Sequence, residues 1–313
     1  MGILNLRRDD DTGIAPAAPT PNTGQEALLT NYSIEVMPRT AAKVEDFRAH
    51  LPTGTRVYIA HIDGTPIEDM VATAARLRAE GFDPMPHFPA RSITNLATLT
   101  DWIARYQGEA DVKEALILAG SLASPRGDFH SSMQLLETGA FDKAGFTRLH
   151  IAGHPEGNRD IDPTGGEAEV MAALQWKQDF ANRSAAAFAI VTQFAFEAAP
   201  ILDWVDRLSA ANITMPVHLG VAGPAKLQTL IKYALACGVG ASLSVLQKRA
   251  KDITRLLLPH EPDDIVNDLA TAKMQGRGHM IERIHFFPLG GIKANTAWAA
   301  AHGGKATRPA AQT

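Results

Sequence analysis

The stretch RVYIAHIDGTPIEDMVATAARLRAEGFDPMPHFP, residues 56–89, decides the fold class of this chain. It begins and ends with short apolar runs, at 56–61 and 83–88, that are typical of buried strands. Between them, apolar residues recur at helical spacing, at Ile67, Met70, Val71, Ala74 and Leu77. Gly81 then stands where a glycine commonly ends a helix. The stretch therefore predicts a strand, a helix and a second strand, which together form a βαβ unit.

The same alternation of apolar runs and helical patterns repeats along the sequence. Eight strands are predicted, at 32–37, 56–61, 83–88, 115–120, 148–153, 187–194, 215–220 and 283–287. Helices with a proline near the first turn are predicted at 200–210 and 223–237, and residues 242–273 add extra helices before the last strand. Eight such units could also form an open doubly wound sheet, but no G-x-G-x-x-G follows the first strand. We therefore expect an α/β protein with a (β/α)₈ barrel.

The barrel is expected to span residues 31–303 as a single domain. A chain of 313 residues is longer than most domains, but (β/α)₈ barrels commonly reach about 250 residues or more. Residues 7–29 are rich in Asp, Pro, Thr, Ala and Gly and lack hydrophobic periodicity. We therefore expect residues 1–30 to form a flexible amino-terminal arm and residues 304–313 to form a flexible tail.

The composition argues against several classes of function. The formal net charge is −4 and no block of Lys and Arg occurs, so the sequence has no electrostatic footprint for nucleic acid. The first residues lack the apolar core of a signal peptide, and no run approaches the ~20 apolar residues that span a membrane. We therefore expect a cytoplasmic protein with neither nucleic acid nor membrane as partner, and the sequence leaves its oligomeric state open.

Several polar residues are predicted at the carboxyl ends of strands, where the active site of such a barrel lies. They are Glu35, Arg39, His61, Asp63, His87, Ser121, His154, Glu156, Gln193, Glu197, His218 and His285, and we expect about half of them to be structural. The candidates for metal ligands among them are His61, Asp63, His87, His154 and His218. Convergence of these side chains at one barrel mouth could make a metal site. The sequence has no His-x-His on the first strand and no pair of ligands at helical spacing, so we expect no catalytic metal.

Glu35 lies in the middle of the first apolar strand, within YSIEVMP. If its side chain faces the barrel interior, burial should disfavour the ionised form and raise its pKa, as a general acid near neutral pH requires. The alternative is an ion pair with Arg39, or a carboxylate on the outer surface. Glu35 is the residue that we expect to be catalytic.

Gln193 ends another apolar strand, within AIVTQFAFE, and its amide can donate and accept hydrogen bonds in one plane. Such a group suits recognition of a planar heterocycle that carries an amide, although a glutamine that only caps a strand end fits the pattern about equally well. His87 is flanked by prolines in PMPHFP, and His154 lies in AGHPEG. Each could bind a phosphate, a carboxylate or a cofactor, or could satisfy a loop carbonyl.

Five short motifs stand at predicted strand ends. They are SIEVMPR (33–39), MPHFPA (85–90), GHPEG (153–157), VTQFAFE (191–197) and IHFFPLGG (284–291). Their sequence and their order resemble the methylenetetrahydrofolate reductase family, over about residues 32–301. The first and fourth motifs are the most specific, because they are similar to the family's S-x-E-x-x-P-[PR] and I-T-Q-x-x-F-[DE].

The resemblance implies a reaction and a role for several residues. Glu35 would correspond to the family's general acid, and Gln193 to the residue that hydrogen-bonds the pterin of the folate. A proton delivered toward N10 opens the five-membered ring of methylenetetrahydrofolate, and hydride addition to the resulting N5 iminium gives methyltetrahydrofolate. Further folate contacts are expected from Ser121, Phe194, His218 and Phe287. Cofactor contacts are expected from His61, His87, His154, Glu156 and Lys177.

The motifs depart from the family pattern where the family binds its flavin. The family's Arg-Gly-Asp run after the fourth strand is replaced by Ala119-Gly120-Ser121. Other polar positions of the family hold Ala60, His154, Asn158, Phe287 and Gly291. Because each charge-assisted contact is worth roughly 1.5 to 3 kcal/mol, we expect FAD to be absent or weakly bound. Hydride would then pass directly between folate and NAD(P)H, with NADH favoured. If a flavin does bind, the candidate contacts are His87, Arg126, His154 and Lys177.

Three alternatives stay open at this point. A standard FAD-dependent reductase would be yellow when purified. A non-catalytic folate-binding paralogue is a second possibility, but it would have little use for a partly buried acid such as Glu35. An unrelated barrel lyase or aldolase would need a Schiff-base lysine at a strand end, and Lys113 and Lys293 lie in predicted loop or helix positions.

Overall fold

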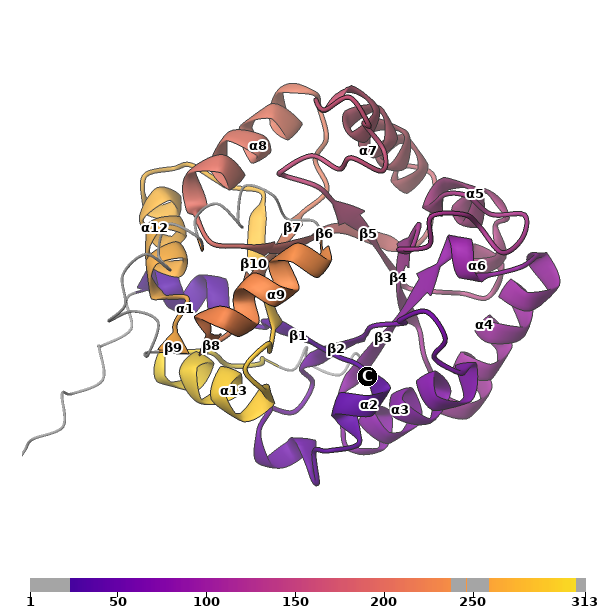
Figure 1. The fold of residues 1–313 in the computed structure, drawn as a ribbon, viewed down its shortest axis with the longest axis horizontal. Helices are drawn as coiled ribbons and strands as arrows, with labels where there is room; N and C mark the ends of the chain where they lie inside the picture. Colours follow the sequence, from indigo (N-terminus) through magenta and orange to yellow (C-terminus); the bar gives the residue numbers. More distant parts are fainter. Residues whose placement is uncertain (1–22, 238–245, 247–258, 308–313) are drawn as a thin grey trace, which may run out of the picture.

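Eight parallel strands close into a barrel (Figure 1). The structure is a computed structural model, and it describes residues 23–237, 246 and 259–307. The strands are β1 (Ser33–Val36), β2 (Arg56–Ile59), β3 (Asp83–Pro89), β4 (Glu114–Leu118), β5 (Arg148–Gly153), β6 (Ala187–Ala195), β7 (Val217–Ala222) and β10 (Ile281–Phe287). Neighbours in this series pair with one another, and β10 pairs with β1 to complete the ring. The (β/α)₈ barrel predicted from the sequence is confirmed.

Helices surround the ring of strands, as Figure 1 shows. They are α3 (Ile67–Ala79), α4 (Leu96–Ala110), α5 (Ser132–Glu137), α6 (Ala140–Lys143), α7 (Ala168–Ala181), α8 (Ala198–Ala210), α12 (Asp263–Met274) and α13 (Ile292–Ala301). Shorter elements follow β1 and β3, namely α2 (Pro38–Ala41), η1 (Phe47–Ala49) and η2 (Ala90–Ser92). None of the described helices is both long enough and apolar enough to cross a membrane.

Helices α3 and α4 show how local sequence fixes the outer layer. Helix α3 carries acidic residues in its first turn and arginines in its last turn, which complements the helix dipole. Asn95 caps the start of helix α4, and its side-chain oxygen accepts a hydrogen bond from the backbone N–H of Thr98 at 2.9 Å. Asp111 caps its other end and adopts a left-handed conformation with a φ of 45°. The sequence therefore specifies both ends of α4.

The chain segment that precedes β1 and the segment that follows α13 are held together. Residues 23–29 form helix α1 (Thr23–Leu29), which contacts α12 and β10 and buries Leu28 and Leu29 completely. Thr30 pairs with Lys305 in a parallel bridge, and Asn31 exchanges hydrogen bonds with Thr307. The flexible segments expected at 1–30 and 304–313 are therefore corrected for residues 23–30 and 304–307, because buried leucines and backbone pairing tie these residues down. The remainder of both segments lies outside the described residues.

Two short strands and a helix are described between β7 and α12. Strand β8 (Ala225–Lys226) pairs in antiparallel fashion with β9 (Pro259–His260), and this pairing was not predicted. Helix α9 (Leu227–Cys237) follows β8 directly, and Figure 1 shows it within the outline of the ring of strands. Its Leu227, Leu230 and Ala234 belong to one buried cluster with aromatic residues of β6 and β10. Of the extra helices expected at 242–273, α12 is described, and most of the remainder lies outside the described residues.

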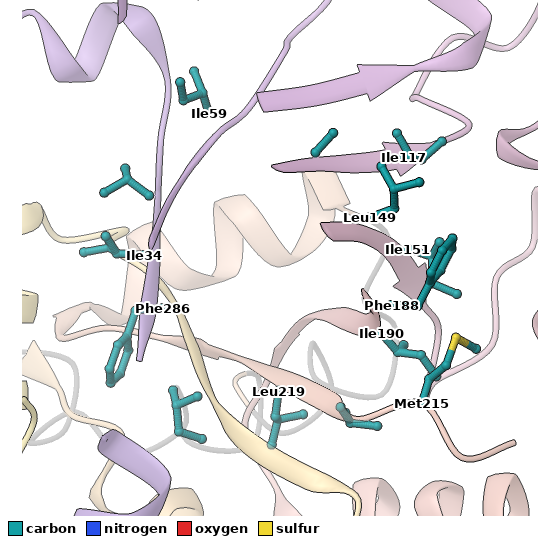
Figure 2. Packing of buried hydrophobic residues seen from close by; sticks show 14 of the residues in the cluster. Ile34, Ile59, Ile117, Leu149, Ile151, Phe188, Ile190, Met215, Leu219 and Phe286 are labelled. Atoms are coloured by element: carbon teal, nitrogen blue, oxygen red, sulfur yellow. The ribbon is translucent and has the colours of Figure 1, made fainter. Parts of the chain in front are cut away.

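The largest apolar core lies between the strands and the outer helices. Figure 2 shows part of this layer. The labelled side chains come from seven barrel strands, with Met215 just before β7, and are Ile34, Ile59, Ile117, Leu149, Ile151, Phe188, Ile190, Met215, Leu219 and Phe286. Because successive side chains of a strand point to opposite faces, the residues that alternate with these face the barrel interior. Those interior positions include several polar groups, which is unusual because branched apolar residues normally fill this space.

We predict opposite effects on stability for two glycine-to-alanine substitutions. A Cβ at Gly153, the last residue of β5, would lie 2.3 Å from Cγ2 of Ile190 and 3.1 Å from the Trp204 ring, so Gly153→Ala should lower the free energy of unfolding by about 1 to 3 kcal/mol. A Cβ at Gly108 in α4 meets no atom within 4 Å, so Gly108→Ala should raise it by about 0.5 to 1 kcal/mol. Urea denaturation followed by circular dichroism measures both. Equal stability of Gly153→Ala and the wild type would contradict the close packing of β5 against β6 and α8.

Candidate functional site

Glu35 is the centre of the candidate site. Its Oε2 atom lies 3.3 Å from Nε2 of His87 on β3 and 3.8 Å from Nε2 of His285 on β10. The other ring nitrogen of His285, Nδ1, lies 2.9 Å from the hydroxyl of Ser33 on β1. The Glu35 side chain is 20% exposed, and both histidines are buried. Three strands that are distant in sequence thus bring one carboxylate and two imidazoles together inside the barrel.

The sequence-based expectation for the pKa of Glu35 was wrong in its direction. Burial does push this pKa upward, but interactions with the nearby imidazoles of His285 and His87 outweigh burial and lower the pKa to about 2. Burial also lowers the pKa of His285, which favours its neutral imidazole. Glu35 is therefore an ionised carboxylate at neutral pH. It is not paired with Arg39, which the sequence had left as an alternative.

An ionised carboxylate between two imidazoles can accept a proton and return it. If the Ser33 hydroxyl donates to Nδ1 of neutral His285, the Nε2–H of that ring points its proton toward Glu35. A second ring nitrogen, Nε2 of His87, contacts the same carboxylate oxygen of Glu35. The arrangement suits general acid–base chemistry, in which Glu35 must first be loaded with a proton before it can act as an acid.

Aromatic side chains form a wall beside this group. The Phe287 ring meets the His285 ring edge to face, with ring centroids 4.9 Å apart. Phe194 of β6 packs against Phe287 at 5.4 Å, and both are buried in the cluster that includes α9. The structure thus brings two of the predicted substrate residues, Phe194 and Phe287, close to the partners of Glu35.

Gln193 is exposed on β6, directly before Phe194. The pairing of β6 with β7 shifts register between Val191 and Phe194, so this part of β6 is irregular. The shift depends on Gly220 of β7, where a Cβ would lie 2.4 Å from the carbonyl oxygens of Thr192 and Gln193. The backbone N–H of Gly220 instead donates to the Thr192 hydroxyl at 2.9 Å. The amide of Gln193 is consequently presented to solvent at the carboxyl end of β6.

The expectation that His218 lies at the carboxyl end of the barrel and contacts folate was wrong. Strand β7 begins at Val217, so His218 is its second residue and lies at the amino-terminal end of the barrel. It is fully buried, and its Nε2 atom lies 2.9 Å from Oε2 of Glu282 at the start of β10. Burial lowers the pKa of His218 to about 4. His218 therefore supports the interior of the barrel and does not belong to the mouth.

His61 is held in the connection after β2. Its Nε2 atom lies 3.1 Å from the carbonyl oxygen of Thr65, and its ring stacks on Trp102 of α4 with centroids 4.9 Å apart. Burial lowers its pKa. Because Trp102 belongs to the outer apolar core, these contacts hold His61 against helix α4, and the charge interaction with His87 adds to the lowering of its pKa.

His154 and Lys177 form a second group, beside β5. Lys177 on α7 is 7% exposed, and burial lowers its pKa to about 8. The pKa of His154 is lowered to about 4, first by burial and then by the positive charge of Lys177. Asn158 contacts the His154 ring at 3.3 Å, and Glu156 lies in the same loop with intermediate exposure. The predicted cofactor residues His154, Glu156 and Lys177 thus share one region.

Arginines tie the loops after β2, β3, β4 and β5 to one another. Arg91 pairs with Asp160 at 2.7 Å and donates to the carbonyl oxygens of Leu122 and His130. Arg126 pairs with Asp63 at 2.7 Å. The predicted substrate residue Ser121 is exposed in the loop after β4 that these arginines fix. Both arginine side chains therefore already have acidic partners.

The sequence placed His285 at a strand end but assigned it no role, and it missed the other interior residues that support the site. His285 stands two positions before Phe287, so it shares the inward face of β10, and this spacing could have indicated its role. Ser33 bears the same relation to Glu35 on β1. Tyr58 and His150 lie within apolar runs, and no local signal separates them from ordinary core residues. In the described part of the chain, no group of three or more His, Cys, Asp or Glu is arranged to hold a metal ion.

Comparisons with known proteins add two fold similarities. No protein-family model matches the chain. An uncharacterized protein from Clostridium thermocellum, described as binding two copies of 5-methyl-5,6,7,8-tetrahydrofolic acid, is similar with a TM-score of 0.49 and 11% identity, over 88% of this chain and 96% of that chain. The catalytic domain of a mannanase from Streptomyces sp. SirexAA-E has a TM-score of 0.37 and 12% identity, over 96% of this chain and 94% of that chain. Neither similarity bears on the function of this chain.

We predict that the protein loses stability as the pH falls from about 6.5 toward 4. Burial lowers the pKa of His150 and His218, so both are neutral when folded and take up a proton when the chain unfolds below pH 6.5. For His218, the change from 6.5 to about 4 corresponds to roughly 3 kcal/mol. Urea denaturation at pH 7, 6 and 5 and constant ionic strength measures the loss. A free energy of unfolding that stays constant over this range would contradict the burial of neutral histidines.

Proposed function

We propose that this chain is an oxidoreductase of the methylenetetrahydrofolate reductase kind. It would interconvert 5,10-methylenetetrahydrofolate and 5-methyltetrahydrofolate with NAD(P)H and NAD(P)⁺. The observation that carries the proposal is the meeting of Glu35, His87, His285 and Phe287 inside the barrel. These residues come from three of the motifs that resemble the family, and they join as a proton-handling group beside an aromatic wall.

In the proposed reaction, Glu35 handles the proton at N10 of the folate. Its ionised carboxylate accepts the N10 proton as the five-membered ring closes in the oxidation of the methyl compound. In the reduction, Glu35 must first receive a proton. A proton taken up from solvent by the His87 or His285 ring can pass to it, and Glu35 then delivers that proton to N10 as the bond between N10 and the methylene carbon breaks. NAD(P)H supplies the hydride to the N5 methylene carbon, and NAD(P)⁺ accepts it in the opposite direction.

Binding of the pterin would use the aromatic wall and the exposed amide of β6. Phe287 and Phe194 offer apolar surface beside His285, and α9 packs over them on the side of β6 and β10. Gln193 can donate and accept hydrogen bonds along the edge of a planar ring that carries an amide. This arrangement would hold the methylene or methyl carbon near Glu35 while α9 limits access by water.

The residues present do not fit a flavin diphosphate well. Of the four contacts named for a flavin, His87 already contacts Glu35 and Arg126 already pairs with Asp63. Lys177 and His154 remain. Burial lowers the pKa of His154 to about 4, so its ring is neutral at pH 7, and Lys177, with a pKa of about 8, is left as the one cation of the four that has neither role. These observations support hydride transfer without a flavin, so no step is routed through one.

The first experiment measures the visible spectrum of the purified protein and its turnover of nicotinamide with methyl- or methylenetetrahydrofolate, with and without added flavin. We expect turnover without bound or added flavin. Glu35→Gln keeps the size of the side chain but cannot accept a proton, so kcat should fall by about 10² to 10⁴. Glu137→Gln, an exposed position on α5, is the matched control and should leave turnover unchanged.

Other results of this experiment would lead to different conclusions. A bound flavin that is required for turnover would restore the standard FAD-dependent mechanism. Binding of folate without turnover would favour the non-catalytic paralogue. No folate binding and no turnover under any of these conditions would refute the proposed function.

Gln193→Ala should weaken the interaction with folate. Loss of one neutral hydrogen bond costs about 0.5 to 1.5 kcal/mol, so the KM for folate should rise about 2-fold to 10-fold with a smaller change in kcat. Gln275→Ala, at an exposed position after α12, is the matched control. Steady-state kinetics measures both variants. An unchanged KM in Gln193→Ala would show that this amide caps a strand end and does not contact folate.

A further inference from the structure

Tyr58 occupies the middle of the barrel interior and contacts both histidines of the site. Its side chain is completely buried. The phenol ring lies 4.3 Å from the His285 ring and 6.4 Å from the His87 ring, measured between centroids. Tyr58 also pairs in register with Glu35 across β1 and β2. One aromatic ring therefore packs against both imidazoles that contact Glu35.

The hydroxyl group of Tyr58 is anchored to another buried histidine. It forms a hydrogen bond with Nδ1 of His150 on β5. His150 is fully buried, and its pKa is lowered well below the ordinary value by burial, the neighbouring His218 and the positive charges of Arg56, Arg148 and Arg283. Because His150 is neutral, its Nδ1 can accept the phenolic proton of Tyr58. The Tyr58 hydroxyl is then committed to His150 and does not compete for Glu35.

The same chain of contacts continues to the amino-terminal end of the barrel. The His150 and His218 rings meet edge to face, with centroids 4.7 Å apart. His218 contacts the carboxylate of Glu282 at 2.9 Å, and the Glu282 side chain is 42% exposed. Arg283 also contacts Glu282. A column of buried polar side chains thus runs from the floor of the site to a carboxylate near solvent.

This column of buried polar side chains lowers the stability of the fold compared with an apolar interior. Nε2 of His150 and Nδ1 of His218 are buried without a hydrogen-bond partner among the described residues. Unpaired buried polar atoms destabilise a fold, and a barrel interior is ordinarily filled with branched apolar side chains. A polar interior retained at this cost calls for a functional explanation.

We infer that Tyr58 is a positioning residue, whose ring, anchored through His150 and His218 to Glu282, holds His285 and His87 in place against Glu35. Movement of either imidazole would change its distance to the Glu35 carboxylate, and this would change the proton affinity of Glu35. An effect of Tyr58 on catalysis rests on the proposed function, because it would act through Glu35. Its structural content can be tested without any substrate.

The test compares Tyr58→Phe with Tyr106→Phe. Tyr58→Phe keeps the ring and removes only the hydroxyl that binds His150. Tyr106 on α4 is also completely buried, outside the barrel interior, and its hydroxyl has no hydrogen-bond partner in the described part of the chain, which makes it a matched control. Imidazole titrations of His285 and His87 are followed by NMR, with each signal assigned by substitution of that histidine.

In Tyr58→Phe, the freed ring should allow more solvent to reach His285, and the midpoint of its titration should rise toward 6.5. Where turnover is measurable, kcat should fall about 10-fold to 100-fold with unchanged KM, and the pH profile of kcat should shift. Tyr106→Phe should change none of these quantities. Identical titrations in wild type, Tyr58→Phe and Tyr106→Phe would overturn the inference.

Glu282→Gln provides a second variant if Tyr58→Phe does not fold. This residue is partly exposed at the opposite end of the barrel, and the substitution removes the charge that contacts His218. A change in the His285 titration in this variant would support coupling along the column, and no change would overturn it. Because these titrations need neither folate nor nicotinamide, failure of the proposed function would not alter their result.

Discussion

In a closed parallel barrel, alternate side chains of every strand enter one narrow interior, so residues far apart in sequence must share it. Glu35, His87 and His285 meet because each occupies an inward position on its own strand. A carboxylate in this space loses hydration, and its electrostatic interactions with the two imidazoles offset that loss. The aromatic wall of Phe287 and the floor formed by Tyr58 both pack against His285. The residues that surround the site therefore contact either the Glu35 carboxylate or the histidines that hold it.

The strand pattern was sufficient to predict the barrel and to place Glu35 within it, because apolar runs that alternate with helices are local signals. It was not sufficient to predict the ionisation of Glu35. Burial could be inferred from the run YSIEVMP, but the partners that reverse its effect lie on β3 and β10, and only closure of the ring brings them near. His218 shows a different limit. Strand β7 begins at Val217, two residues later than predicted, and this small shift moves His218 from one end of the barrel to the other.

Other differences arise where tertiary packing overrides weak local patterns. Residues 23–29 lack the periodicity of a long helix, yet Leu28 and Leu29 fill space beside α12 and β10 and so fix helix α1. Tyr58 and His150 stand in runs that resemble ordinary buried strands, and their polar groups find each other only inside the barrel. The interior combines apolar residues such as Met85 and Leu116 with this polar column, a mixture that strand periodicity alone does not reveal.

Because Thr30 pairs with Lys305, the barrel itself does not fix which strand must come first in the sequence. Segments that precede β1 and follow α13 meet at one point on the surface, so a circularly permuted chain could join them through a short linker and begin in a surface loop elsewhere. Such a permutant would retain every strand pair while making β10 and β1 consecutive. Glu35 and His285 would then belong to adjoining segments, and their partnership would become a local feature of the sequence.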